Sequence, residues 1–146
     1  MIRPALRPLL AALALAACSM DERAARRNPG KECIECHRPG GKDPDHLFTA
    51  GGTVYAFPAA AADAGVGGVE IVITDASGRV VRLTSNDAGN FWTDARLAFP
   101  VAVRARHAGA DGGAGAGSPP CLSGRCNECH ALPASGGARG RIAAAP

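Results

Sequence analysis

A five-residue pattern occurs twice in this chain, once near each end. Residues 33–37 read CIECH and residues 126–130 read CNECH. Each copy places two thiols three positions apart, and a histidine follows the second thiol immediately. The repeat predicts two similar sets of sulfur and imidazole groups that each bind the same kind of ligand. No other feature of the sequence constrains the fold as much.

The spacing matches the C-x-x-C-H motif that attaches c-type haem. Two thiols at this separation can form thioethers with the two vinyl groups of one haem, and the histidine that follows is then placed to bind the iron. We therefore expect two covalently bound haem c groups, each with its iron. The residues predicted to hold them are Cys33, Cys36, His37, Cys126, Cys129 and His130.

Paired thiols also have other uses. Two C-x-x-C pairs can supply four thiolates to zinc. Zinc ribbons separate their pairs by 15–20 residues, whereas about ninety residues intervene here, and zinc does not require the adjoining histidines. A thioredoxin-like redox pair needs a βαβ setting, which the pattern of this chain does not show. Zinc and disulfides stay open as alternatives.

The first seventeen residues have the features of an export signal. Arg3 and Arg7 form a positive n-region, and the apolar run 9–17 is too short to cross a bilayer as a helix. Removing residues 1–17 lowers the formal net charge of +3 by two. Haem propionates would lower it further, so the basic pI does not indicate a nucleic-acid partner.

Residues 15–18, LAAC, resemble the lipobox of bacterial lipoproteins. The resemblance implies cleavage before Cys18, lipidation of its sulfur and stable anchoring by several acyl chains. Ser19 in place of Asp favours the outer membrane under the best-known sorting rule. We therefore expect an exported protein, lipid-anchored to the bacterial cell envelope on a periplasmic or surface face. A plain secretory signal with Cys18 as a bystander is the alternative.

The middle of the chain has the alternation of a β protein. Val69, Ile71 and Ile73 share one face of a predicted strand. The sequence 75–78, DASG, predicts a type I hairpin turn with its glycine in the left-handed region. The predicted strands are 52–57, 69–74, 79–84, a short one from 91, and 101–106. Short strands with regular turns predict a mainly β fold, a small antiparallel β-sandwich flanked by two loop-rich haem-binding segments.

Three stretches of this segment, 52–55, 67–75 and 84–91, resemble the carboxypeptidase regulatory-like, transthyretin-like β-sandwich family. The resemblance covers under half of the chain and implies a fold rather than an activity. The predicted organisation is a signal peptide at 1–17, a tether at 18–31, a first haem-binding segment at 32–48, a β-sandwich at 49–108, a Gly/Ala/Pro linker at 109–120, and a second haem-binding segment and tail at 121–146.

Two histidines are left over for the far side of the irons. The chain has four His, and its two methionines lie in the leader and the tether. We therefore predict His46 and His107 as the second axial ligands, so that each iron is held by two imidazoles. If five strands run up and down, His46 pairs with His37 and His107 with His130, and the haems lie at opposite poles. A linker that folds back would instead bring them together.

These features predict an electron-transfer protein rather than an enzyme, a membrane-anchored dihaem cytochrome of the c type that serves other redox carriers of the envelope. Haems held by two imidazoles leave no open site for a substrate, and their potentials should be low because no axial Met is present. The alternatives are a haem enzyme or gas sensor with one open site, or a non-catalytic binding lipoprotein. Cys121 is left over as a free thiol or an intermolecular bridge, so self-association is also open.

Overall fold

The computed structural model describes residues 25–107 and 120–144. The predicted signal peptide, the predicted lipidation site Cys18, half of the predicted tether and most of the predicted linker therefore lie outside the described residues. The described part is mainly β, as predicted. Its elements are the helices α2 (Cys33–Cys36) and α3 (Cys126–Cys129) and the strands β1 (Ala50–Tyr55), β2 (Val69–Thr74), β3 (Val80–Thr84), β4 (Asn90–Thr93), β5 (Ala102–His107) and β6 (Ile142–Ala143).

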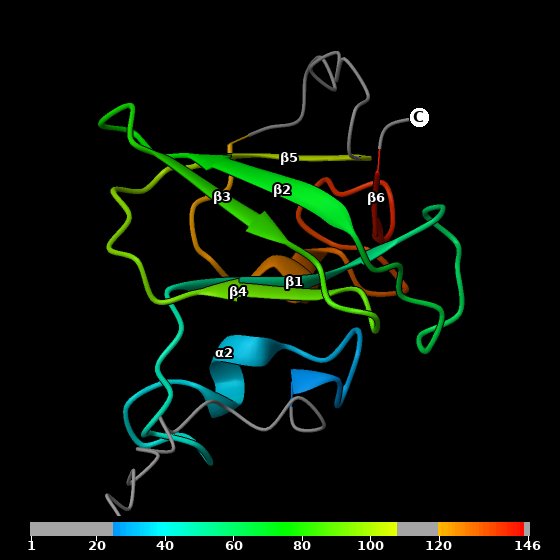
Figure 1. Cartoon of the computed structure of the whole chain (residues 1–146), viewed down its shortest axis with the longest axis horizontal. Coiled ribbons are helices and arrows are strands. Elements are labelled where there is room, and N and C mark those ends of the chain that lie inside the picture. The colour runs from blue at the N-terminus through cyan, green and yellow to red at the C-terminus, as the bar shows by residue number, and fades with distance from the viewer. Residues whose placement is uncertain (1–24, 108–119, 145–146) are drawn as a thin grey trace, which may run out of the picture.

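The strands form two three-stranded sheets, ordered β4-β1-β6 and β3-β2-β5. In the first, β4 runs antiparallel to β1, whereas the short β6 runs parallel to it. In the second, β2 is central and antiparallel to both neighbours. Figure 1 shows the second sheet above β1 and β4, with α2 on the other side of them. The first sheet therefore lies between the second sheet and α2.

The two sheets share one hydrophobic core. Strand β2 alternates fully buried and half-buried residues along its whole length, as its sequence predicted. Strand β1 is buried on both of its faces. The buried cluster consists of Ala50, Val54, Val69, Ile71, Ile73, Phe91, Val101 and Cys126. A cysteine of the second motif is thus part of the core, which ties this motif to the sheets.

Two turns of the same kind connect the strands. Gly78 donates its amide to the Asp75 carbonyl at 2.9 Å and has a φ of +84°. Gly89 donates in the same way to Asn86 at 2.7 Å and has a φ of +79°. Glycine adopts this left-handed conformation without the steric cost of a Cβ. The prediction of a turn glycine in the left-handed region at 75–78 is confirmed.

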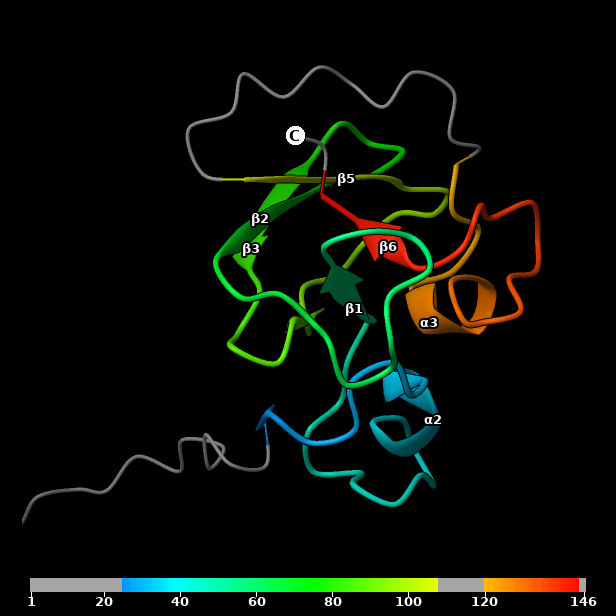
Figure 2. The same ribbon diagram turned by 90° about the vertical axis from the view of Figure 1, so that its right-hand side faces the viewer.

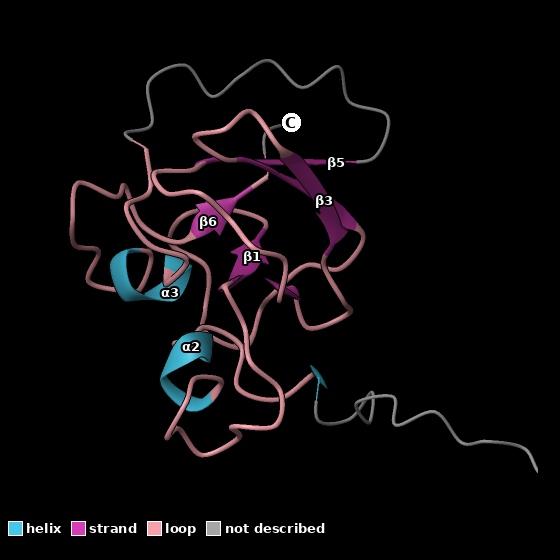
Figure 3. Ribbon diagram, turned by 90° about the vertical axis from the view of Figure 1, so that its left-hand side faces the viewer, coloured by secondary structure: helices cyan, strands magenta, loops and turns pink. Residues whose placement is uncertain are grey.

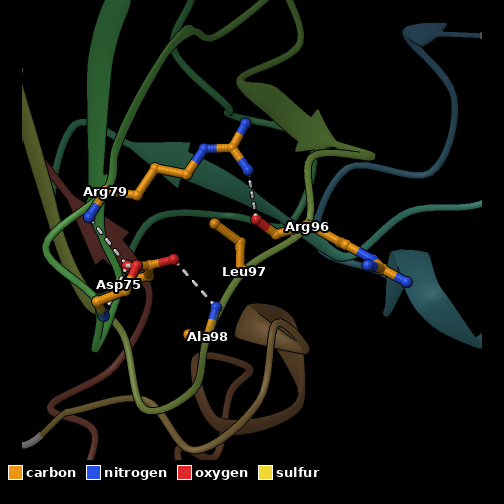
Figure 4. A pocket seen from close by; sticks show the side chains of 6 residues that line it. Asp75, Arg79, Arg96, Leu97 and Ala98 are labelled. Atoms are coloured by element: carbon orange, nitrogen blue, oxygen red, sulfur yellow. Dashed lines mark hydrogen bonds between the residues drawn. The ribbon is translucent and has the colours of Figure 1, made fainter.

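A surface pocket lies beside the first of these turns, and Figure 4 shows Asp75 turned into it. The Asp75 carboxylate accepts the Ser77 hydroxyl at 2.6 Å and the amides of Ser77, Arg79 and Ala98 at 2.9 to 3.0 Å. The Ser77 hydroxyl, followed by the Ala98 amide, lowers the pKa of Asp75 to about 2. The carboxylate is therefore occupied in holding the loop 94–98 against the hairpin, and we assign the pocket a structural role.

Candidate cofactor-attachment site

The first motif lies on the outer face of β1. Its four-residue helix α2 begins at Cys33, and the Glu32 side chain caps the helix by accepting the Ile34 amide at 3.0 Å. The Cβ of Cys33 would stand only 3.1 Å from a Cβ added to Gly51 of β1. Glycine at this position of the strand lets the helix approach the sheet closely.

The second motif takes the edge of β1 that the short β6 leaves open. Gly51 donates its amide to the Gly124 carbonyl at 2.9 Å, and Thr53 donates its amide to the Asn127 side-chain oxygen at 3.0 Å. A side-chain amide therefore takes the place of a strand neighbour. A Cβ added to Gly52 would stand 2.9 Å from the Cβ of Cys126, so Gly52 makes room for α3 as Gly51 does for α2.

The two motifs are consequently neighbours, although about ninety residues separate them along the chain. Their first cysteines pack against successive glycines of one strand, and these contacts keep the Cβ atoms of Cys33 and Cys126 within roughly 12 Å of each other. Figures 2 and 3 show α2 and α3 beside β1 from opposite sides. Of the two arrangements that the sequence left open, the motifs have the one in which the segment after residue 120 folds back onto the first strand.

Both motif histidines are oriented in the same way. The Nδ1 atom of His37 lies 2.8 Å from the carbonyl oxygen of His46, nine residues further on. The Nδ1 atom of His130 lies 2.7 Å from the carbonyl oxygen of Gly140, ten residues further on. A carbonyl only accepts, so each Nδ1 carries the proton and each Nε2 has its lone pair free for a metal. Such a bond orients and strengthens a metal-binding imidazole.

Aromatic packing holds the first of these rings in place. The His37 ring stacks on Phe48 with centroids 3.9 Å apart, and Phe48 stacks in turn on Trp92 of β4 at 5.6 Å. The Phe48 amide also donates to the His37 carbonyl at 3.0 Å. Sequence reasoning missed Phe48 as part of the site, although an aromatic residue just after a breaker-rich loop was a usable signal.

The second histidine depends on the C-terminal segment. Arg141 donates from Nε to the Ala60 carbonyl at 2.8 Å and from Nη1 to the Tyr55 hydroxyl at 3.1 Å, and its guanidinium lies over the Tyr55 ring. These contacts fix the neighbouring Gly140, whose carbonyl faces His130. The segment was expected to be loop and tail, but it supplies both β6 and the acceptor that orients the second imidazole.

The thiols of the two first cysteines are hard to ionise. Burial, with a smaller contribution from Glu32, raises the pKa of Cys33 from 9.0 to about 12, and burial also raises the pKa of Cys126. Zinc binds thiolates, whereas a thioether to haem is uncharged and tolerates burial. Within residues 25–107 and 120–144, no three His, Cys, Asp or Glu side chains are grouped to hold a metal ion. The four motif thiols are therefore not gathered into one four-thiolate group among the described residues.

The raised thiol pKa predicts how the haem-free chain responds to alkali. Between pH 9 and 12 the folded chain keeps the Cys33 proton that the unfolded chain releases, so its free energy of unfolding should fall as the pH rises through this range. The contribution is fully present below pH 9. In the haem-loaded chain the sulfur is a thioether and cannot titrate.

Urea denaturation of both forms at several pH values tests this prediction. Tyr55, whose pKa burial also raises, titrates in both forms and provides the common background. An equal loss of stability in the two forms would show that the thiols do not contribute.

The two spare histidines are placed differently from each other. His46 is half-exposed, and its Nδ1 lies 2.9 Å from Asp43, whose pKa this contact lowers. Its carbonyl oxygen lies beside the Nδ1 atom of His37. The pairing of His37 with His46 on one iron, which followed from five strands running up and down, stays a prediction. His107 ends β5, where it pairs with Val69 of β2 in the sheet β3-β2-β5. Their roles as axial ligands stay predictions.

Cys121 lies next to the second motif. Its backbone pairs with Val101, and its thiol is close enough to Cys129 for a thiolate there to raise its pKa, an effect smaller than that of burial. Three large apolar side chains of the two segments predicted to bind haem are exposed to solvent, namely Leu47, Leu122 and Leu132. Exposed apolar groups beside both motifs are what an apolar cofactor would cover.

The comparisons with known proteins add no family to this picture. No family model, no curated protein and no solved structure matches the chain. In the part of the chain that the structure describes, no helix is long and apolar enough to span a membrane. The function must therefore be inferred from the geometry of the two motifs.

Proposed function

We propose that this chain is a dihaem c-type cytochrome that transfers electrons in the bacterial cell envelope. The observation that carries the proposal is the shared orientation of the two motif histidines. His37 and His130 each present Nε2 away from a carbonyl that accepts from Nδ1, at 2.8 and 2.7 Å. The C-x-x-C-H spacing alone does not require such an acceptor. A carbonyl that accepts from Nδ1 of both histidines supports a role for both as axial ligands to iron.

The haems, when bound, supply one-electron redox chemistry, and this chain attaches, orients and buries them. Cys33, Cys36 and His37 would hold the first haem, and Cys126, Cys129 and His130 the second. Because both motifs pack against β1, electrons can cross from one haem to the other within one chain. Other redox carriers of the envelope would donate and accept the electrons, and no catalytic step on a substrate is part of this proposal.

We further propose that the two sheets form a small sandwich of the transthyretin-like type and that lipid on Cys18 anchors it to the outer membrane. The shared core of the sheets supports the first statement. The described part of the chain begins at residue 25, only seven positions after Cys18. The intervening residues span at most roughly 25 Å when extended, so the lipid would keep the domain near the membrane surface.

A potentiometric titration followed by optical absorbance tests the proposed function. We expect two one-electron transitions of a haem chromophore at low potential, as haems held by two imidazoles should give. A chain matured in a host that attaches c-type haem and then showing no redox-active absorbance would contradict electron transfer by this protein.

One observation favours a second function. His46 meets His37 through its main chain, and its imidazole contacts Asp43. If it keeps that position when haem is bound, the first iron would have an open coordination position. An iron with an open position binds small molecules, as in a haem enzyme or gas sensor. Carbon monoxide separates the two functions, because it binds ferrous haem only at an open or easily vacated position.

We predict that the ferrous wild-type protein resists carbon monoxide at both haems, and that His46→Ala and His107→Ala each convert one haem to rapid binding. The optical change on adding the gas to the reduced protein measures this, with half of the full amplitude expected for each variant. Rapid binding at one haem of the wild type would favour the second function. Unchanged behaviour of a variant would remove that histidine as a ligand.

A further inference from the structure

Asn127 occupies an unusual position inside the second motif. It stands between Cys126 and Cys129, where the C-x-x-C spacing alone places no demand on the residue type, yet it is only 4% exposed. A buried side-chain amide is costly unless its polar atoms are bonded. The bonds that Asn127 makes therefore indicate why an amide is there.

The two ends of the Asn127 side chain bind different partners. Its Oδ1 accepts the Thr53 amide of β1 at 3.0 Å, which docks α3 on the edge of the strand. Its Nδ2 donates to the Lys31 carbonyl at 2.7 Å and to the Thr53 hydroxyl at 3.1 Å. Lys31 lies two residues before Cys33, so one amide group joins the second motif directly to the segment that precedes the first motif.

The same Thr53 hydroxyl of β1 also binds the segment that precedes the first motif. It accepts the Gly30 amide at 2.8 Å and donates to the Asn90 side-chain oxygen at 2.8 Å. Asn90 donates in turn to the carbonyls of Ala25 and Arg27, each at 3.1 Å. Thr53, Asn90 and Asn127 are all nearly inaccessible to solvent. A fully bonded buried network of this kind holds one arrangement of its parts.

We propose that Asn127 is a positioning residue that fixes the separation and mutual orientation of the two haems, and with them the electron exchange within one chain. This inference rests on the proposed function. The amide does not touch the reacting iron atoms and acts through the backbone that carries the cysteines. The donor half of the amide joins the two motifs, and the acceptor half holds α3 on β1.

Asn127→Asp separates these two roles. The carboxylate keeps an acceptor for the Thr53 amide, but it puts an oxygen where Nδ2 donated, so it repels the Lys31 carbonyl. Asp75→Asn is the matched control, because it is an isosteric exchange of carboxylate and amide at a similarly buried position whose bonds go only to Ser77, Arg79 and Ala98, outside this network. Both variants are measured at pH 8 or above, where the carboxyl group introduced by Asn127→Asp is more fully ionised.

The experiment uses the haem-loaded full chain. Pulsed EPR of the oxidised protein gives the distribution of iron–iron distances, and a redox titration gives the separation of the two midpoint potentials. We expect Asn127→Asp to broaden the distance distribution at least twofold and to change the separation of the potentials, while Asp75→Asn leaves both near the wild-type values. Haem content by mass spectrometry confirms that each variant carries both haems.

An Asn127→Asp protein that holds two haems with the wild-type distance distribution and potentials would overturn the inference while leaving the proposed function intact. If the aspartate variant does not fold, Asn127→Ala takes its place. It introduces no charge but removes both halves of the amide, and the same broadening is expected relative to the wild type. A wild-type chain that matures without haem would overturn the proposed function and this inference together.

Discussion

A chain in which Cys126 and Cys129 are both replaced by Ala is expected to carry one haem, held by the first motif alone. Replacement of Cys33 and Cys36 should leave one haem on the second motif. Each motif holds its own pair of thiols and its own oriented histidine, so loss of one pair removes one attachment and leaves the other. Haem-specific staining of a denaturing gel, scaled to the amount of protein, should fall to half in each case.

Cys121→Ala is the control for this experiment. It removes a thiol that lies near the second motif but outside the C-x-x-C-H pattern, and it should retain the full stain. Equal staining of the wild type and the Cys126/Cys129 variant would show that the second motif does not hold haem. Loss of the entire stain in either double variant would show that the two motifs serve one shared ligand.

Substitution of the two glycines on which the motifs pack should lower the free energy of unfolding. A Cβ on Gly52 would stand 2.9 Å from both the Cys126 Cβ and the Phe91 ring, and neither group can move freely in the core. Overpacking of this kind costs about 1–3 kcal/mol. We expect Gly52→Ala to lower the free energy of unfolding by about 2–3 kcal/mol, at the upper end of that range, and to impair haem attachment at the second motif.

Gly51→Ala is the matched variant one position away. Its Cβ would meet Cys33 at 3.1 Å on the outer face of the strand, where α2 can shift slightly, so its cost should stay below about 1.5 kcal/mol. Urea denaturation at equal haem content compares the two. A smaller loss for Gly52→Ala than for Gly51→Ala would mean that α3 does not pack on β1 as described.

Local patterns account for the parts of the fold that could be predicted. The alternation of β2 and the turn glycine at Gly78 each depend on a few consecutive residues, and both are found. The two-residue strand β6 could not be predicted, because two residues show no periodicity. Arg141 anchors the segment to the Tyr55 ring and hydroxyl, far away in the sequence, and Ile142 packs against the core.

Some residues of the candidate site could likewise be predicted from the sequence, and others could not. The spacing of cysteines and histidines predicts the residues that attach the cofactor, because the geometry of haem dictates it. The acceptors that orient His37 and His130 are backbone carbonyls, which leave no mark in the side-chain pattern. The neighbouring glycines Gly51 and Gly52 were a usable signal, since glycine inside a strand often marks the close approach of another segment.

The intact mass of the correctly matured chain, measured under denaturing conditions, tests the central claim most directly. The account predicts a polypeptide heavier by two haem groups that denaturation does not remove, with an absorbance typical of thioether-linked haem. A colourless chain at the mass of the bare polypeptide, or one that gains zinc through the sulfurs of Cys33, Cys36, Cys126 and Cys129, would contradict it.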